Sequence, residues 1–228
     1  MLKVYLVRHG ETDWNIEGRL QGLTDIALNA KGLAQARLLA ERLAEEFNFV
    51  ALYASPLRRA YVTGEIIGAR LGLTPIPDTR LVEHNLGELE GLTSADVKAR
   101  FPEFHRMWHV GEKHVPFPGE EPSASFQHRL SEFLREIQAR HAEGKVIVIT
   151  HGGAMGMIMA LLMHIDLAWR LPFWFENASL NIVEFGSAVP RVRVLNDTCH
   201  LRAARAKMVL EDAANGNCAR ATLPAATR

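Results

Sequence analysis

The chain has 228 residues, of which 48% are hydrophobic and 23% are charged, as in an ordinary folded globular protein. Basic and acidic residues number 26 each, so the overall charge gives no reason to expect nucleic acid or an anionic membrane as a partner. Two cysteines, Cys199 and Cys218, are too few for a disulfide scaffold. No signal peptide is evident at the N-terminus, and residues 150–153 interrupt the most apolar stretch, 146–163. We therefore expect a cytoplasmic protein without a membrane span.

The first stretch of the chain combines a strand pattern with chemically reactive side chains. Residues 2–7 are mostly apolar and partly β-branched, which predicts a buried strand, and the strand ends at Arg8-His9-Gly10. In an open α/β sheet, ligands bind at the carboxyl ends of the strands, so an arginine and a histidine there predict an anion site. A solvated strand end with a chance basic pair is the alternative. The following loop, 10–28, is long for a strand-to-helix connection, which is typical of functional loops.

Two helices and a second strand follow in alternation. Asn29 suits the N-cap of a helix whose apolar residues recur at helical spacing, namely Leu33, Ala36, Ala40, Leu43 and Phe47. Residues 49–54 predict a buried strand, and Ser55-Pro56 predicts the start of a helix that ends near Gly72. This order of strand, helix, strand and helix predicts parallel strands with helical crossovers.

The stretch from Thr74 to Pro122 is less regular. It predicts a short strand near residues 80–83, a helix over 94–100, and an excursion over about 84–122 that covers a site as a lid. Its histidines 105, 109 and 114 have spacings that could bind a metal, but no cysteine or carboxylate lies in register with them, so we expect no metal site.

The remaining elements complete the predicted sheet. An amphipathic helix begins at Ser123 or Ser125, the β-branched residues 146–149 predict a central strand, and residues 154–163 predict a buried helix. Residues 180–185 and 191–195 predict an edge hairpin, which leaves a homodimer through that edge open. An aromatic cluster (Trp169, Phe173, Trp174 and Phe175) is expected in the core, with a partner surface as the alternative.

These elements predict an α/β fold. It is a three-layer α/β/α sandwich with a mostly parallel central sheet, helices on both faces and a small lid excursion. We expect one catalytic domain over residues 1–203 and a mobile C-terminal tail over 204–228.

Three strand ends meet at one edge of this sheet. They bring Arg8-His9, the helix start with Arg58 and Arg59, and His151-Gly152 into one crevice, because neighbouring strands lie about 5 Å apart. Cations in the first turn of a helix are disfavoured by roughly 0.3–1 kcal/mol each, and a bound anion would reverse that penalty. Gly152-Gly153 opens a helix and offers backbone N–H groups to an anion. Guanidinium groups match phosphate oxygens, so the crevice predicts a phosphate site.

A phosphate ligand suggests a reaction. An imidazole can attack phosphorus and form a phosphoenzyme, while arginines and His151 stabilise the charge on the equatorial oxygens. Glu83 is the best-placed acid to protonate the leaving alkoxide. The sequence contains no Walker A loop and no metal-binding carboxylate cluster, so we expect catalysis without a metal or another cofactor.

Four blocks of the sequence resemble those of the histidine phosphatase superfamily, the phosphoglycerate mutase-like proteins. They are residues 6–12 with Trp14-Asn15 and Gln21-Gly22, residues 55–60, residues 81–83 with 87–91, and residues 150–153. The resemblance implies that His9 is the phosphorylated nucleophile and that Glu83 is the proton donor. It also implies a phosphate pocket of Arg8, Arg59 and His151, with Asn15, Gln21, Gly22 and Gly152 nearby. It selects Arg59 over Arg58, which the charge argument leaves open.

The superfamily contains mutases and phosphatases. In its cofactor-dependent mutases the segment between the acid and the second histidine is longer and carries an arginine pair, which this chain lacks between Glu83 and His151. Residues 119–123 instead resemble the Gly-Gly-Glu-Ser turn of the phosphatase branch, although Glu120 replaces a glycine and Pro122 a serine. We therefore expect a phosphatase. A phosphoglycerate mutase and a catalytically silent phospho-ligand sensor are the alternatives.

The expected partner is a small phosphomonoester whose identity the sequence leaves open. A sugar phosphate, a phosphoglycerate, phosphoserine and a nucleotide-loop phosphate such as α-ribazole phosphate all fit.

Overall fold

The computed structural model describes residues 1–110, 116–117, 119–165, 172–186 and 189–202. The predicted tail, His114 and Trp169 lie outside these residues. In chain order the elements are β1 (Leu2–Arg8), α1 (Asp13–Ile16), α2 (Ala30–Ala44), β2 (Phe49–Ala54), α3 (Arg58–Leu71), β3 (Ile76–Pro77), the 3-10 helices η1 (Thr79–Leu81) and η2 (Gly87–Leu89), α4 (Ser94–Arg100), α5 (Pro102–Val110), α6 (Ser123–Arg140), β4 (Gly144–Thr150), α7 (Gly152–Leu162), β5 (Leu180–Phe185) and β6 (Arg191–Asp197).

The strands form one sheet in the order β3-β2-β4-β1-β5-β6. Strands β1 to β4 are parallel to one another, whereas β5 is antiparallel to both β1 and β6. The predicted mostly parallel sheet is therefore confirmed. Because β2, β4 and β1 are neighbours, the three chain segments that follow them start at one sheet edge. The start of β5 reaches the same edge from the opposite direction.

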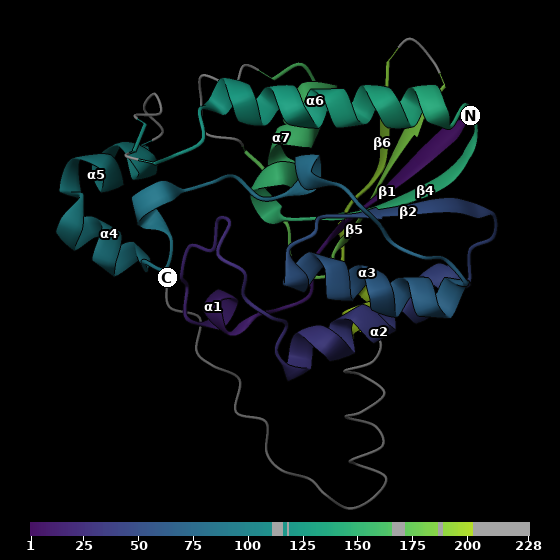
Figure 1. The fold of residues 1–228 in the computed structure, drawn as a ribbon, viewed down its shortest axis with the longest axis horizontal. Coiled ribbons are helices and arrows are strands. Elements are labelled where there is room, and N and C mark those ends of the chain that lie inside the picture. Colours follow the sequence, from purple (N-terminus) through teal and green to yellow (C-terminus); the bar gives the residue numbers. More distant parts are fainter. Residues whose placement is uncertain (111–115, 118, 166–171, 187–188, 203–228) are drawn as a thin grey trace, which may run out of the picture.

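Two hydrophobic cores fill the space on the two faces of the sheet. Along β1, Val4 and Leu6 belong to the core beneath α6 and α7, whereas Tyr5 and Val7 belong to the core beneath α2 and α3. Figure 1 shows these two helix pairs on opposite sides of the sheet. A strand that is covered on both faces needs apolar side chains in both directions, which explains the nearly continuous apolar sequence of β1. The three-layer α/β/α sandwich is confirmed.

The start of α3 differs from the prediction. The helix begins at Arg58 with Leu57 as N-cap, rather than at Ser55-Pro56. The Leu57 side chain makes no capping hydrogen bond. Instead, the carboxylate of Asp25 in the long loop accepts a hydrogen bond from the Arg58 backbone N–H at 2.7 Å. An anion does lie at this helix start, as the charge argument required, but the protein itself supplies it.

The predicted strand at residues 80–83 is wrong, because residues 79–81 form the 3-10 helix η1. The Asp78 side chain accepts hydrogen bonds from the backbone N–H and from the guanidinium of Arg80, and this local closure competes with strand pairing. Two apolar residues also lie outside the core. Phe47 is 74% exposed because α2 ends at Ala44, and Trp174 is 75% exposed.

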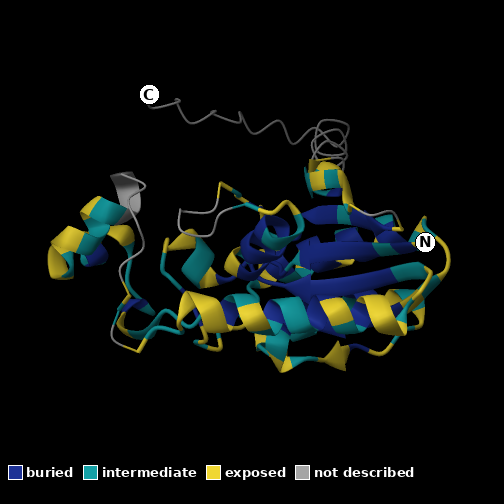
Figure 2. Ribbon diagram, turned by 90° about the horizontal axis from the view of Figure 1, so that it is seen from above, coloured by how far each residue is buried: buried dark blue, intermediate teal, exposed yellow. Residues whose placement is uncertain are grey.

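The segment expected to form a lid contains α4 and α5, which lie beyond the edge of the sheet toward which β1 runs (Figures 1 and 2). Figure 2 shows that buried residues concentrate in the sheet and that this helix pair is largely exposed or half-buried. Hydrogen bonds from Leu20 N to Leu92 O at 3.0 Å and from Gly91 N to Leu20 O at 2.8 Å join the segment to the long loop. Its role as a lid stays a prediction.

The outer surface gives two further findings. No helix in the described part of the chain is both long and apolar enough to cross a membrane. Strand β6 is an edge strand of the sheet with mostly exposed side chains, and its pairing with a second copy stays a prediction.

The backbone of the loop that follows β1 passes very close to the backbone of α2, and this contact fixes the loop. A Cβ atom on Gly32 in α2 would lie 2.1 Å from the backbone oxygen of Glu11, and one on Gly10 would lie 2.5 Å from the oxygen of Gly32. Replacing Gly32 by alanine should therefore reduce the free energy of unfolding by roughly 1–3 kcal/mol, although alanine favours a helix. Urea unfolding measures this change.

Gly64→Ala is the matched control, because a Cβ there would meet only side-chain carbons, the nearest at 3.3 Å. Equal unfolding free energies for Gly32→Ala and the wild type would contradict this account of the crossing.

Candidate active site

His9 lies just beyond the carboxyl end of β1 and is only 3% exposed. Its Nδ1 lies 2.6 Å from the carbonyl oxygen of Gly10. A carbonyl oxygen can only accept a hydrogen bond, so Nδ1 carries the proton and Nε2 keeps its lone pair in the neutral ring. Burial, followed by the charges of Arg59 and Arg8, holds the pKa of His9 well below its usual value. The ring is therefore neutral and has a free nucleophilic nitrogen.

A polar segment before β5 holds the backbone of His9. The side-chain amide of Asn177 donates hydrogen bonds to the carbonyl oxygens of His9 at 3.1 Å and Gly10 at 3.4 Å. The backbone N–H of Ala178 also donates to the His9 carbonyl at 3.1 Å. Sequence reasoning missed Asn177. Its only signal is a polar residue close before a strand whose direction the sequence leaves open.

Arg59 is completely buried in the first turn of α3. Its guanidinium donates to the carbonyl oxygens of Thr24 at 2.8 Å and Gly22 at 2.7 Å, and its Nε–H donates to Nδ1 of His151 at 3.2 Å. Burial lowers the pKa of Arg59 to about 10, so the group is still charged at neutral pH. Arg58, by contrast, is exposed, which separates the two arginines of this helix start.

Glu90 holds the same loop from its other side. Its carboxylate accepts hydrogen bonds from the backbone N–H of Leu23 at 2.8 Å and of Thr24 at 3.0 Å, and from the Thr24 hydroxyl at 2.6 Å. Gly22 has a φ of +50°, and a Cβ there would lie 2.0 Å from a carboxylate oxygen of Glu90. The loop thus directs carbonyl groups toward Arg59 and amide groups toward Glu90. The sequence motif at 87–91 gave Glu90 no role.

Both ring nitrogens of His151 have protein partners. Nδ1 accepts from Arg59, so the proton of the neutral ring is on Nε2, which donates to the hydroxyl of Ser55 at 2.8 Å. Burial, followed by the charge of Arg59, holds the pKa of His151 well below its usual value. The ring centroids of His151 and His9 are 5.2 Å apart. Ser55, predicted as a helix cap, is instead the partner of this histidine.

Arg8 reaches the site from the last position of β1. One Nη1 hydrogen donates to the carbonyl oxygen of Phe175 at 2.5 Å, while the buried Nε–H has no hydrogen-bond partner within the described residues. Burial lowers the pKa of Arg8, and the charges of Glu83 and Glu176 oppose that shift. A Cβ on Gly152 would lie 3.5 Å from Nε, so the glycine leaves room beside it. An anion would satisfy this N–H group.

The carboxylate of Glu83 lies at the N-terminus of α7. It accepts hydrogen bonds from the backbone N–H groups of Gly153 at 2.8 Å, Ala154 at 2.9 Å and His84 at 2.9 Å. The backbone N–H of Gly153 was expected to hold a bound anion, but it holds the candidate acid instead. A Cβ on Gly153 would lie 2.5 Å from a Glu83 carboxylate oxygen, which explains the glycine at this position.

The polar residues of the long loop support its shape. The side-chain oxygen of Asn15 accepts hydrogen bonds from the backbone N–H and the hydroxyl of Thr12, both at 3.0 Å. Gln21 donates to the same hydroxyl at 2.9 Å, while its buried side-chain oxygen has no partner within the described residues. Within these residues, no group of three His, Cys, Asp or Glu side chains is placed to hold a metal ion.

Comparison with known proteins shows the family of the chain. The family model of the histidine phosphatase superfamily (branch 1) matches residues 4–198. Phosphoserine phosphatase 1 of Hydrogenobacter thermophilus is 37% identical over 202 residues, covering 88% of this chain and 95% of the relative. The metal-independent phosphoserine phosphatase of Arabidopsis thaliana is 34% identical over 204 residues, covering 87% and 83%.

A solved structure of the mycobacterial glucosyl-3-phosphoglycerate phosphatase, in complex with VO3, matches with a TM-score of 0.79 and 30% identity, covering 86% of this chain and 99% of the other. The chain therefore belongs to branch 1 of the histidine phosphatase superfamily, and its relatives support a phosphatase.

Proposed function

We propose that this chain is a metal-independent phosphomonoesterase that works through a phosphohistidine on His9. The observation that carries the proposal is the hydrogen bond from His9 Nδ1 to Gly10 O, because it leaves Nε2 unprotonated in a neutral, buried ring. The two guanidinium groups of Arg8 and Arg59 supply the positive charge that a phosphoryl group needs. The name of the Arabidopsis relative supports a reaction without metal.

The reaction has two steps. In the first, Nε2 of His9 attacks phosphorus, an N–P bond forms, the P–O bond to the alcohol breaks, and protonated Glu83 gives its proton to the leaving oxygen. In the second, Glu83 takes a proton from water as the water oxygen attacks phosphorus and the N–P bond breaks. Arg8 and Arg59 stabilise the charge on the equatorial oxygens in both loose transition states.

The other polar residues keep these groups in place. His151 accepts the Nε–H of Arg59 and packs beside His9, which orients both the guanidinium and the nucleophile. Asn15, Gln21 and Gly22 shape the loop that borders the phosphate, and Gly152 leaves space for Arg8. All nine residues that the sequence nominated thus have a role in the proposed pocket, although several act by positioning.

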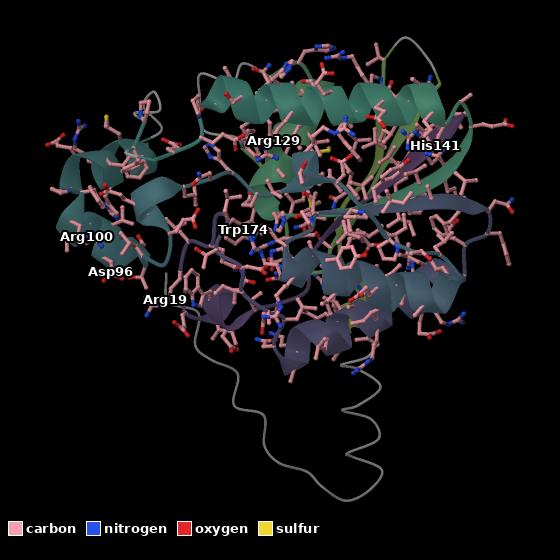
Figure 3. All side chains as sticks on the ribbon, viewed as in Figure 1. Arg19, Asp96, Arg100, Arg129, His141 and Trp174 are labelled. Atoms are coloured by element: carbon pink, nitrogen blue, oxygen red, sulfur yellow. The ribbon has the colours of Figure 1, made fainter. Side chains whose placement is uncertain are left out.

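We further propose phosphoserine as the preferred substrate. Two relatives carry the name phosphoserine phosphatase. One acceptor of this chain suits a substrate ammonium rather than a phosphate, namely the exposed carboxylate of Glu176. The charge of Glu176 acts on Arg8, and the indole N–H of Trp174 lies 3.3 Å from a carboxylate oxygen of Glu176. Trp174, which is 75% exposed, is labelled near the middle of the view in Figure 3.

His9→Gln should abolish hydrolysis of p-nitrophenyl phosphate, because the neutral nucleophilic nitrogen is lost. The wild-type enzyme should remain active with EDTA present and should give an acid-labile, alkali-stable phosphoenzyme after rapid quenching. Phosphate release and radiolabel retention measure the two results. A failure to trap any phosphoenzyme would support a silent sensor. Efficient conversion of 3- to 2-phosphoglycerate with little phosphate release would support the mutase.

Stability should fall in acid because His9 and His151 are buried as neutral rings. Their pKa values are lowered in the folded chain, so below pH 6.5 the unfolded chain binds protons that the folded chain does not. Above about pH 7 neither state binds these protons, and the free energy of unfolding is unaffected by the two rings. Below pH 6.5 the free energy of unfolding falls by up to about 1.4 kcal/mol per group for each pH unit. Urea unfolding at pH 7.5, 6.5 and 5.5 tests this, with imidazole ¹⁵N NMR as the check on both rings. A protonated His9 ring at pH 6.5 would contradict the account.

Glu176→Gln should lower kcat/KM for L-phosphoserine by roughly two- to fivefold, the size expected for loss of an exposed charge pair. Its kcat/KM for 3-phosphoglycerate, which carries a hydroxyl group in place of the amine, should be unchanged or higher. Phosphate release at low ionic strength measures both. An equal change for the two substrates would remove Glu176 from substrate selection.

A further inference from the structure

Arg129 on α6 uses all of its hydrogen-bond donors on one short stretch of chain and one carboxylate. A guanidinium has five N–H groups in a fixed plane, and here each has an acceptor. Nη1 donates to the carbonyl oxygens of Arg80 at 2.6 Å and Val82 at 2.7 Å, and Nη2 donates to that of Glu83 at 2.9 Å. The remaining two N–H groups donate to the carboxylate of Glu121, at 2.8 and 2.9 Å.

The stretch that Arg129 holds carries the candidate acid. Residues 79–81 form a 3-10 helix instead of a strand, so they lack the ladder hydrogen bonds that fix the ends of β1, β2 and β4. Side chains from other elements take over that function. Besides Arg129, the hydroxyl of Thr150 donates to the carbonyl oxygen of Leu81 at 2.7 Å. The backbone position of Glu83 therefore depends on side chains.

The turn that contains Glu121 belongs to the same unit. The backbone N–H of Glu121 donates to the carbonyl oxygen of Asn85 at 3.0 Å, and the His84 ring lies 2.7 Å from the carbonyl oxygen of Glu121. The Arg129 side chain is 16% exposed and that of Glu121 is 18% exposed, so both are largely shielded from water. A half-buried, bidentate pair of this kind is far more rigid than an exposed ion pair.

Aromatic packing fixes the plane of the guanidinium. The Arg129 guanidinium lies 4.7 Å from the ring centroid of Phe126, and the His84 ring stacks on the same residue at 4.6 Å with an interplanar angle of 13°. Figure 3 shows Arg129 on the side of α6 that faces the rest of the molecule. The amides of α7 then hold the carboxylate of Glu83 while Arg129 holds its backbone.

We propose that Arg129, held by Glu121, is a positioning residue for proton transfer by Glu83. The inference rests on the proposed function, because it assumes that Glu83 is the acid. A displacement of about 1 Å at an acid can cost a large share of its catalytic contribution. Arg129 does not need to touch the substrate for this role. The hydrogen bonds between Arg129 and Glu121 also tie the position of residues 119–121 to that of Glu83.

A purely structural role and a positioning role differ in their dependence on the leaving group. p-Nitrophenolate is a stable anion and leaves without a proton, whereas an alkoxide needs one. A misplaced Glu83 should therefore slow an alkyl phosphate much more than p-nitrophenyl phosphate. A partly unfolded or depleted enzyme would lose the same fraction of activity on both.

The experiment compares β-glycerophosphate with p-nitrophenyl phosphate for Arg129→Lys, Arg129→Gln, Glu121→Gln and Glu83→Gln. We expect the kcat/KM for β-glycerophosphate to fall about 10- to 100-fold more than that for p-nitrophenyl phosphate in the Arg129 and Glu121 variants. The loss should be largest in Glu83→Gln. Arg135→Lys is the matched control, because Arg135 is on the same helix with a 66% exposed side chain. It should change neither value.

The outcomes separate the two proposals. If Glu83→Gln slows both substrates equally, Glu83 is not the acid and the proposed function fails at that step. If Glu83→Gln discriminates between the substrates while Arg129→Lys and Glu121→Gln either slow both equally or slow neither, the positioning role alone is overturned. Circular dichroism identifies any variant that does not fold. If Arg129→Gln does not fold, Arg129→Lys and Glu121→Gln still test the positioning role.

Discussion

A buried guanidinium must find acceptors for its N–H groups, and in this protein that requirement determines the path of the loop that follows β1. Arg59 takes the carbonyl groups of Gly22 and Thr24, which forces the loop to present its oxygens inward. The amide groups of the loop then face outward, where Glu90 accepts them. The same guanidinium fixes the tautomer of His151 through its Nε–H. One charged side chain thus orders residues from three distant parts of the sequence.

The charges around His9 are arranged in favour of an anion. The two arginines stay protonated at neutral pH despite burial, whereas the two histidines stay neutral because they are buried beside those arginines. The Glu83 carboxylate is held at a helix N-terminus by backbone amides rather than by an ion pair with either arginine. Positive charge therefore remains available for an anion, and the His9 ring stays unprotonated near neutral pH.

Sequence patterns predicted strands β1, β2, β4, β5 and β6, but not the short edge strand β3, and they predicted that the side chains directly after β1 and β4 would meet. Arg8, His9 and His151 were predictable because each ends or follows an apolar strand run, and parallel strands bring such ends together. Asn177 and Arg129 were not, because they reach the site from an antiparallel strand start and from a packed helix, and only tertiary pairing determines those contacts. The strand predicted before Glu83 is absent for a local reason. The Asp78 side chain accepts a hydrogen bond from the Arg80 backbone N–H and stabilises a 3-10 helix there.

The direction of β5 also sets the residues before it apart from the parallel strand ends. Since β5 runs against β1, the residues before it approach the carboxyl end of β1 from the opposite direction, and they contact the backbone of His9 through Asn177 and Ala178. The side chains just upstream, Trp174 and Glu176, are exposed and take no part in the parallel core. The hydrogen bonds that hold the His9 segment come from Asn177 and Ala178 and not from the side chains of Trp174 and Glu176. For engineering, those two exposed positions can therefore be exchanged between relatives of this fold without removing a hydrogen bond to the His9 backbone.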